Sequence, residues 1–156
     1  MLFIQFIALF GSCKASSIQH LEDYKKKTLI LNSKEELTVF IAKSISQQKL
    51  GLSGVKDEDF KDHYAMLFPG DKMEVRQFWM PETFFDLDLF FLNEDFYILE
   101  VQRKLKHSPF KSYIKRPRYS KEVFCQHVLE MKSSSPLSKK LKPGMTLKWK
   151  KKALTP

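Results

Sequence analysis

The chain of 156 residues contains only two cysteines, and it lacks the motifs that mark common catalytic and nucleotide-binding sites. The distance in sequence between Cys13 and Cys125 gives no evidence for a disulfide, and Cys125 with His127 is a weak indication of zinc binding or of a nucleophile–base pair because no further Cys or His lies at ligand spacing. No glycine-rich loop of the phosphate-binding type is present, and there is no Gly-x-Ser-x-Gly element of a serine hydrolase. These absences leave no motif that assigns a reaction, and we expect neither a metal nor an organic cofactor.

Long hydrophobic runs are also missing. The longest, Leu2–Phe10, is far shorter than the roughly 20 apolar residues that a membrane-spanning helix needs, and small residues follow it. This pattern predicts a signal peptide over residues 1–17. A signal peptide has a Lys or Arg before its apolar run, and none is present here. A buried N-terminal strand or helix is therefore the alternative.

Cys13 follows the apolar run directly after Gly11 and Ser12, which resembles the cleavage site of a bacterial lipoprotein. In such a site the cysteine becomes the lipidated first residue of the mature chain, and the lipid holds the protein on a membrane. Ordinary cleavage near residues 15–17 and a disulfide with Cys125 are the alternatives. We therefore expect an exported bacterial protein, either periplasmic or anchored to a membrane as a lipoprotein.

Acidic residues are scarce in the last third of the chain. Residues 103–156 carry 16 Lys+Arg and 2 Asp+Glu, a balance of +14, whereas residues 1–102 carry 11 and 16, a balance of −5. A cationic region of this kind favours polyanionic partners such as lipid headgroups, anionic envelope polymers or nucleic acid. A solvated basic surface without a dedicated partner would have the same composition.

Basic and aromatic side chains alternate in the first part of this cationic region, an arrangement that suits ion pairing combined with stacking or membrane insertion. The candidate surface for an anionic partner consists of Lys104, Lys106, Lys111, Lys115, Arg116, Arg118, Tyr113 and Tyr119. In an exported protein this surface suits a phospholipid membrane or an anionic glycan better than nucleic acid.

Hydrophobic periodicity and turn residues predict one β-rich domain with short helices. Residues 18–27 have no apolar period and are interpreted as a tether, and residues 103–120 are interpreted as an extended basic loop. The helix expected at 45–50 follows a Ser-x-x-Gln capping pattern and ends at Gly51. A second helix is expected at 136–141, and strands are expected at 28–31, 37–41, 64–68, 76–80, 87–92, 96–102, 123–130 and 145–150.

The stretch from Phe78 to Phe91 has the highest aromatic density in the chain and is predicted to form the core. Trp79 and Met80 are expected to close that core where the chain turns at Pro81. Asp88 lies inside an apolar strand, and burying an unpaired carboxylate is costly. We therefore expect backbone amides or a cation such as Arg76 to bind Asp88, or Asp88 to lie at a cavity mouth, and we predict a structural role for it.

Six short motifs resemble, in their order and spacing, the DUF192 (UPF0127) family of uncharacterised and often exported small domains. They are Gly51–Gly54, Tyr64–Phe68, Phe78–Met80, Leu87–Phe91, Val128–Glu130 and Leu141–Met145. The resemblance covers residues 36–150 and implies a compact α+β domain that is β-rich, with a barrel-like antiparallel sheet and one or two short helices. It implies no established activity.

The predicted organisation is a signal peptide at 1–17, a tether and first strand at 18–35, a DUF192-like domain at 36–150 and a basic tail at 151–156. We expect a monomeric, non-enzymatic binding module of the cell envelope, which contacts the membrane through a lipid anchor or its basic surface, or binds an anionic envelope polymer. The first alternative is a hydrolytic enzyme acting on an envelope polymer, with Asp88 in its site. The second is a nucleic-acid binder. In an enzyme, we would expect Trp79, Met80 and Asp88 to line one open cleft that contains a carboxylate with a shifted pKa.

Overall fold

The structure is a computed structural model that describes residues 21–32, 35–109 and 118–151. The predicted signal peptide, the predicted lipidation site Cys13 and residues 152–156 of the predicted basic tail lie outside this part of the chain. Within the described ranges, no helix is long and apolar enough to cross a membrane.

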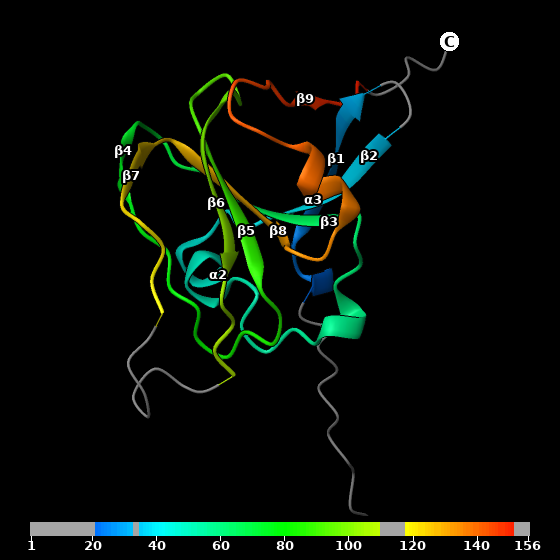
Figure 1. Ribbon diagram of the computed structural model, residues 1–156, viewed down its shortest axis with the longest axis vertical. Helices are drawn as coiled ribbons and strands as arrows, with labels where there is room; N and C mark the ends of the chain where they lie inside the picture. The colour runs from blue at the N-terminus through cyan, green and yellow to red at the C-terminus, as the bar shows by residue number, and fades with distance from the viewer. Residues whose placement is uncertain (1–20, 33–34, 110–117, 152–156) are drawn as a thin grey trace, which may run out of the picture.

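Seven strands form one sheet that curls into a half-barrel, in the order β6-β5-β8-β3-β2-β1-β9 (Figure 1). Their bounds are β1 Lys25–Asn32, β2 Glu35–Ile41, β3 Tyr64–Phe68, β5 Leu87–Leu92, β6 Ile98–Leu105, β8 His127–Lys132 and β9 Lys148–Trp149. A separate two-stranded ribbon consists of β4, Glu74–Arg76, and β7, Val123–Cys125. The predicted β-rich α+β fold with a barrel-like sheet and two short helices is confirmed.

One pair of neighbouring strands is parallel, whereas every other pair in the sheet is antiparallel. The parallel pair is β2 with β3, and a parallel pair needs a crossover connection of a dozen or more residues. Residues 42–63 supply this crossover and contain α2, Ile45–Leu50, and the 3₁₀ helix η1, Asp57–Asp59.

The central strands β5 and β8 are buried along their whole length because both faces of the sheet are covered. Leu89 and Phe91 of β5 point to one apolar cluster, which residues 52–60 and 80–85 cover. Phe90 and Leu92 point to a second cluster, which α3, Pro136–Lys140, and residues 141–149 cover. Alternation along a strand thus places neighbouring residues in two different cores.

The predicted helix at 45–50 is confirmed as α2, and its ends have the expected caps. The Ser44 hydroxyl accepts a hydrogen bond from the Gln47 amide at 3.2 Å, and the Gln47 side chain accepts one from the Ser44 amide at 3.0 Å. Gly51 has a φ of 49° and its N–H donates to the Gln47 carbonyl, which ends the helix.

The N-terminal segment differs from the predicted tether. Leu21 and Tyr24 are buried in the first cluster, and β1 begins at Lys25. The three lysines at 25–27 therefore belong to a strand of the sheet. The segment is polar on average, but its apolar side chains Leu21 and Tyr24, three residues apart, both pack into the core.

Only the strands predicted at 64–68 and 87–92 have the predicted bounds, and two of the others differ because contacts distant in sequence decide them. The prediction of a strand at 76–80 is wrong, since β4 covers Glu74–Arg76 and Trp79 makes only an isolated bridge with Tyr119. The predicted strand at 123–130 divides into β7 and β8 at Gln126, whose N–H donates to the Leu92 carbonyl at 2.8 Å. The predicted loop from residue 103 is also shorter, because β6 continues to Leu105.

Candidate functional site

Asp88 is almost fully buried, with 2% of its surface exposed, and donors satisfy both of its carboxylate oxygens. Oδ2 accepts hydrogen bonds from Arg103 Nη1 at 2.7 Å and from the Ser138 hydroxyl at 2.6 Å. Oδ1 accepts from the Ser133 hydroxyl at 2.7 Å and from the Lys104 amide at 2.9 Å. Burial acts to raise the pKa of Asp88, but these four hydrogen bonds lower it below the usual range. The carboxylate is therefore held ionised by its partners.

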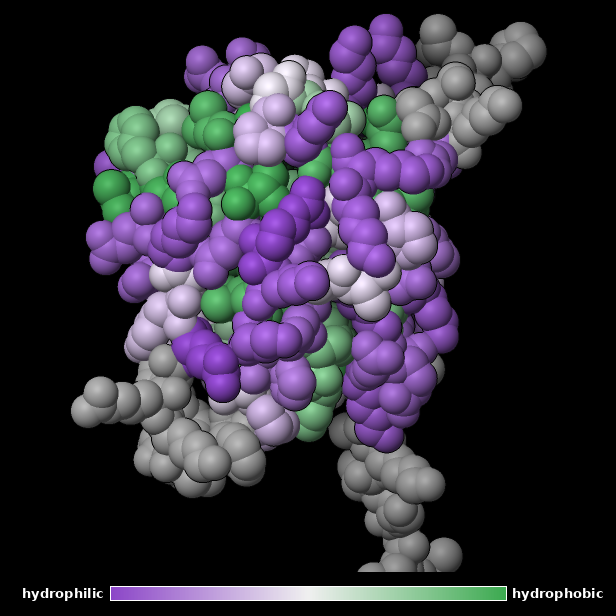
Figure 2. Space-filling model, viewed as in Figure 1, coloured by the Kyte–Doolittle hydropathy of each residue, from purple (hydrophilic) through white to green (hydrophobic). Residues whose placement is uncertain are grey.

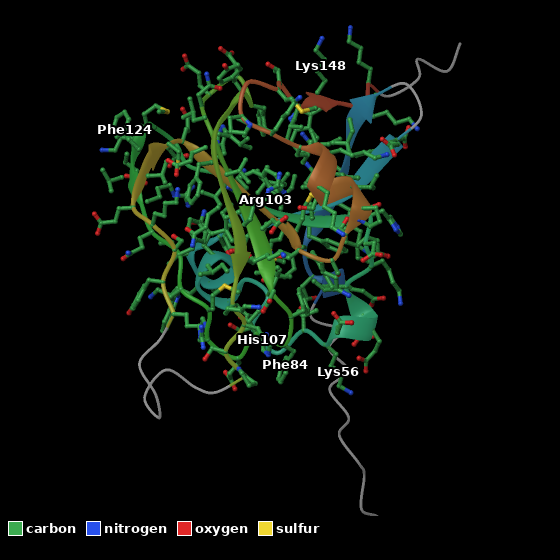
Figure 3. All side chains as sticks on the ribbon, viewed as in Figure 1. Lys56, Phe84, Arg103, His107, Phe124 and Lys148 are labelled. Atoms are coloured by element: carbon green, nitrogen blue, oxygen red, sulfur yellow. The ribbon has the colours of Figure 1, made fainter. Side chains whose placement is uncertain are left out.

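The partner cation is Arg103 of β6, whereas the sequence suggested Arg76 as an example. Arg103 also donates to the Ser138 carbonyl at 2.9 Å and to the Leu141 carbonyl, and its guanidinium lies 5.1 Å from the centre of the Phe90 ring (Figure 3). The network connects β5, β6 and α3. This arrangement has the character of a structural connection, because it leaves the carboxylate no free side.

Trp79 and Met80 lie elsewhere, on the other side of the sheet. They line a small cavity of about 30 Å³ together with Leu52, Phe68, Leu87 and other residues of the first cluster. Met80 is buried, whereas Trp79 is 43% exposed. The cavity has room for one or two water molecules. Asp88 does not line it, so the three residues that the sequence grouped are divided between two places.

The same cavity contains Glu130, which the sequence analysis included only as part of a family motif. Glu130 lies in the middle of β8, opposite Met66 of β3 and Leu89 of β5, and is 4% exposed. Its carboxyl group makes no hydrogen bond or ion pair with any described residue, and burial raises its pKa to about 8. Glu130 is therefore mostly protonated near neutral pH and remains able to bind a partner.

The buried side chains of Lys132 and His127, which are also ionisable, differ from Glu130 because they have partners. Lys132 pairs with Asp57 at 2.8 Å, and the His127 ring accepts a hydrogen bond from the Gly70 amide at 3.2 Å. Buried polar groups in proteins are nearly always hydrogen-bonded, and an exception calls for an explanation such as strain, a catalytic role, or a water molecule or ion at the site. Glu130 is such an exception.

A groove of about 380 Å³ adjoins this cavity, and the two share the side chains of Lys49, Phe78 and Trp79. Its outer wall is β4 with Arg76, which is held by hydrogen bonds to the Phe68 and Gln126 carbonyls, each at 2.9 Å. The volume lies in the range of small-ligand pockets. A carboxylate with a shifted pKa therefore lies close to an open groove, but it is Glu130, and it lines the adjoining cavity.

The predicted basic surface is described only in part. Lys111, Tyr113, Lys115 and Arg116 lie outside the described residues. Lys106 pairs with Asp86 at 2.8 Å, which reduces its availability for an external partner. Lys104 and Arg118 are exposed and make no ion pair with a described side chain, and Tyr119 is 52% exposed.

Exposed apolar side chains project in two cross-strand pairs on the β4–β7 side of the molecule. Val75 lies opposite Phe124, and Trp79 lies opposite Tyr119, with exposed fractions between 43% and 63%. Opposite residues of an antiparallel pair point to the same side. Apolar surface is visible at this end of the molecule in Figure 2, and Figure 3 labels Phe124 there. We call these four residues the aromatic ridge, and Arg118 is next to it in the chain.

Comparisons with known proteins agree with the fold. The family model DUF192, described as Uncharacterized ACR, COG1430, matches residues 28–149. No protein of curated function matches the chain.

Two crystal structures are similar to the chain. One is a candidate transcription regulator from Sinorhizobium meliloti 1021, with a TM-score of 0.65 and 24% identity over 81% of this chain and 95% of that chain. The other is a protein of unknown function from Novosphingobium aromaticivorans DSM 12444, with a TM-score of 0.60 and 20% identity over 81% and 85% of the two chains. At this level of identity, the likeness extends to the fold alone.

Proposed function

The chain belongs to the DUF192 family, a family of unknown function, and from that premise we propose that it is an exported or lipid-anchored envelope module that binds an anionic partner. The binding surface in this proposal is the aromatic ridge together with Arg118, which is next to it in the chain. The observation that supports it most directly is the exposed pair of Trp79 and Tyr119 next to Arg118, a cation that forms no ion pair within the described part of the chain. Aromatic side chains insert at the level of lipid headgroups, and cations attract anionic lipids.

A binding role agrees with the state of Asp88. Its oxygens are fully occupied by donors, and its pKa lies below the usual range, so it is poorly suited to donate a proton to a substrate. The position of Glu130, in contrast, favours the hydrolytic alternative as a second candidate. A buried acid with a pKa of about 8 beside an open groove has the protonation state of a general acid. Glu74 in the groove is a second carboxylate for such chemistry.

The membrane proposal is tested with vesicles of phosphatidylglycerol and phosphatidylcholine at about 0.15 M salt, using the chain without residues 1–17. We expect it to bind the anionic vesicles, and the double variant R118E/Y119S to lose binding. Lys56 is an exposed cation far from Phe124 in the view of Figure 3, so Lys56→Glu is the matched control and should keep binding. Absence of binding to both anionic vesicles and anionic glycans would reject the proposal.

Two further measurements separate the alternatives. Binding to single-stranded DNA without binding to vesicles would favour the nucleic-acid alternative. Release of fragments from an envelope polymer that is abolished by both E130Q and E74Q would favour the hydrolase. The exported compartment itself is tested by intact-mass analysis of the protein from its native host, where an acylated Cys13 would identify a lipoprotein.

A further inference from the structure

The lining of the groove and the cavity includes charged side chains of both signs. The membrane contact proposed for the aromatic ridge gives these side chains no role. The cavity contains the Glu130 carboxyl group, the groove carries Arg76 of β4, and Lys49 of α2 lines both. Neither cation forms an ion pair with a described side chain. An acidic group therefore lies in the cavity, and two cationic groups lie closer to the solvent.

The carboxyl group of Glu130 contacts no described donor and faces the cavity, so a ligand group that enters the cavity can bind it directly. The cavity volume of about 30 Å³ limits that partner to a group about as large as one or two water molecules. A primary ammonium group fits this space and donates charge-assisted hydrogen bonds to a carboxylate. Trp79, at the shared wall, presents an aromatic surface suited to a cation.

Arg76 is prepared to bind an anion. One of its terminal nitrogens is fixed by the Phe68 and Gln126 carbonyls, and its guanidinium lies 5.3 Å from the centre of the Phe78 ring. Its remaining donors make no hydrogen bond with the described residues, and a planar guanidinium with free donors is well suited to phosphate. Lys49 of α2 adds a second, exposed cation to the lining of the groove.

We propose that the groove and the cavity form one site for an aminoethyl phosphate group, with its ammonium at Glu130 and its phosphate at Lys49 and Arg76. This chemistry is that of an ethanolamine lipid headgroup or of free phosphoethanolamine. A quaternary ammonium has no N–H to donate to Glu130. A simple anion leaves Glu130 without a partner, and a simple amine leaves both cations unused.

The charged groups that face the ligand path are few. Lys49 lines both spaces, and Glu74 lines the groove beside Arg76. From the flanking strands β3 and β5, the residues opposite Glu130 are the apolar Met66 and Leu89. The competing arrangement is that Lys49 itself turns inward and pairs with Glu130.

The test is calorimetric titration of the full chain with phosphoethanolamine, compared with phosphocholine, ethanolamine and glycerol phosphate. We expect saturable binding of phosphoethanolamine and at least about tenfold weaker binding of the other three, because each lacks one charge or its donors. Glu130→Gln and Lys49→Met should each weaken binding by a similar factor. Glu94→Gln and Lys56→Met change exposed charges outside the site and should leave binding unchanged.

Proton exchange provides a second readout. Glu130 loses its proton when an ammonium binds, so titrations near pH 7 in buffers of different ionisation enthalpy should show proton release, which E130Q abolishes. The ¹³C resonance of the Glu130 carboxyl should also titrate at lower pH in the complex than in the free protein. This measurement reports directly on Glu130 in the folded protein, so it separates a loss of binding from a loss of folding. Binding of free phosphoethanolamine identifies the soluble source. Binding only to vesicles that contain phosphatidylethanolamine identifies the lipid.

Three results would overturn this proposal: equal binding of phosphocholine, unchanged affinity in E130Q, or tighter binding in Lys49→Met, which would show that Lys49 occupies the cavity. The R118E/Y119S variant should still bind phosphoethanolamine. The proposed site for aminoethyl phosphate and the proposed membrane contact of the aromatic ridge can therefore be rejected independently of each other.

Discussion

Replacing Glu130 with Gln should stabilise the protein at alkaline pH, because the buried carboxyl group costs far more free energy when it is ionised than when it is neutral. Its pKa in the folded protein is about 8, and its ordinary value is 4.5. The folded state therefore holds the proton more tightly than the unfolded chain. Its contribution to stability is fully present below about pH 4.5 and is lost as the pH rises toward 8.

The magnitude follows from the difference between the two pKa values. About 3.5 pH units at 1.36 kcal/mol each correspond to a loss of about 5 kcal/mol of unfolding free energy between acidic and alkaline pH. Glutamine has nearly the same shape and does not ionise. The advantage of E130Q over the wild type should therefore grow by several kcal/mol between about pH 5 and about pH 9.

Urea unfolding followed by tryptophan fluorescence measures this difference at both pH values. Burial and the charge of Arg76 lower the pKa of His127, but His127 is present in both proteins and its contribution cancels. Glu94→Gln, a change of an exposed acid, is the control and should show no such growth. Equal pH dependence in E130Q and the wild type would refute the argument that Glu130 is buried without a partner.

Three further predictions concern stability and reactivity. Asp88→Asn should lower the unfolding free energy by about 3 kcal/mol in urea titrations, since Arg103 loses its counter-charge; an unchanged midpoint would contradict the structural role. Gly70→Ala should lower it by about 2 kcal/mol in the same assay, because the added carbon would lie 2.3 Å from the Gln126 carbonyl oxygen and the backbone cannot yield easily. Burial raises the pKa of Cys125 to about 11, so iodoacetamide should alkylate it slowly in the folded protein and quickly in urea, and equal rates would argue against its burial.

Local signals in the sequence were sufficient where an element depends mainly on its own residues. The bounds of α2 follow from its capping residues and Gly51, and the apolar runs at 64–68 and 87–92 are strands with the predicted bounds. Elements decided by distant partners were less accurate. The break at Gln126 depends on a hydrogen bond to Leu92, a residue in another strand.

The candidate site followed the same division. The need of Asp88 for partners was predictable from its apolar neighbours, but the identity of Arg103 depends on the pairing of β5 with β6. Trp79 and Met80 were recognised by residue type, whereas Glu130 gave no local signal apart from its place in an apolar strand. A Glu at the centre of a run such as Val-Leu-Glu-Met is the pattern that could have identified it.

The pairing of β1 with β9 has a consequence for the protein during its synthesis. Leu29 lies opposite Trp149, and the Lys150 amide donates to the Thr28 carbonyl, so the last described strand pairs with the middle of the outer edge of the first. The hairpin of β1 and β2 leaves the ribosome early, and a two-stranded hairpin alone is only marginally stable in water. Its open edge can pair with other chains until more than a hundred further residues have been translated. A stalled or truncated chain that ends before β9 should therefore aggregate, and the interval before completion is when a holding chaperone would matter most.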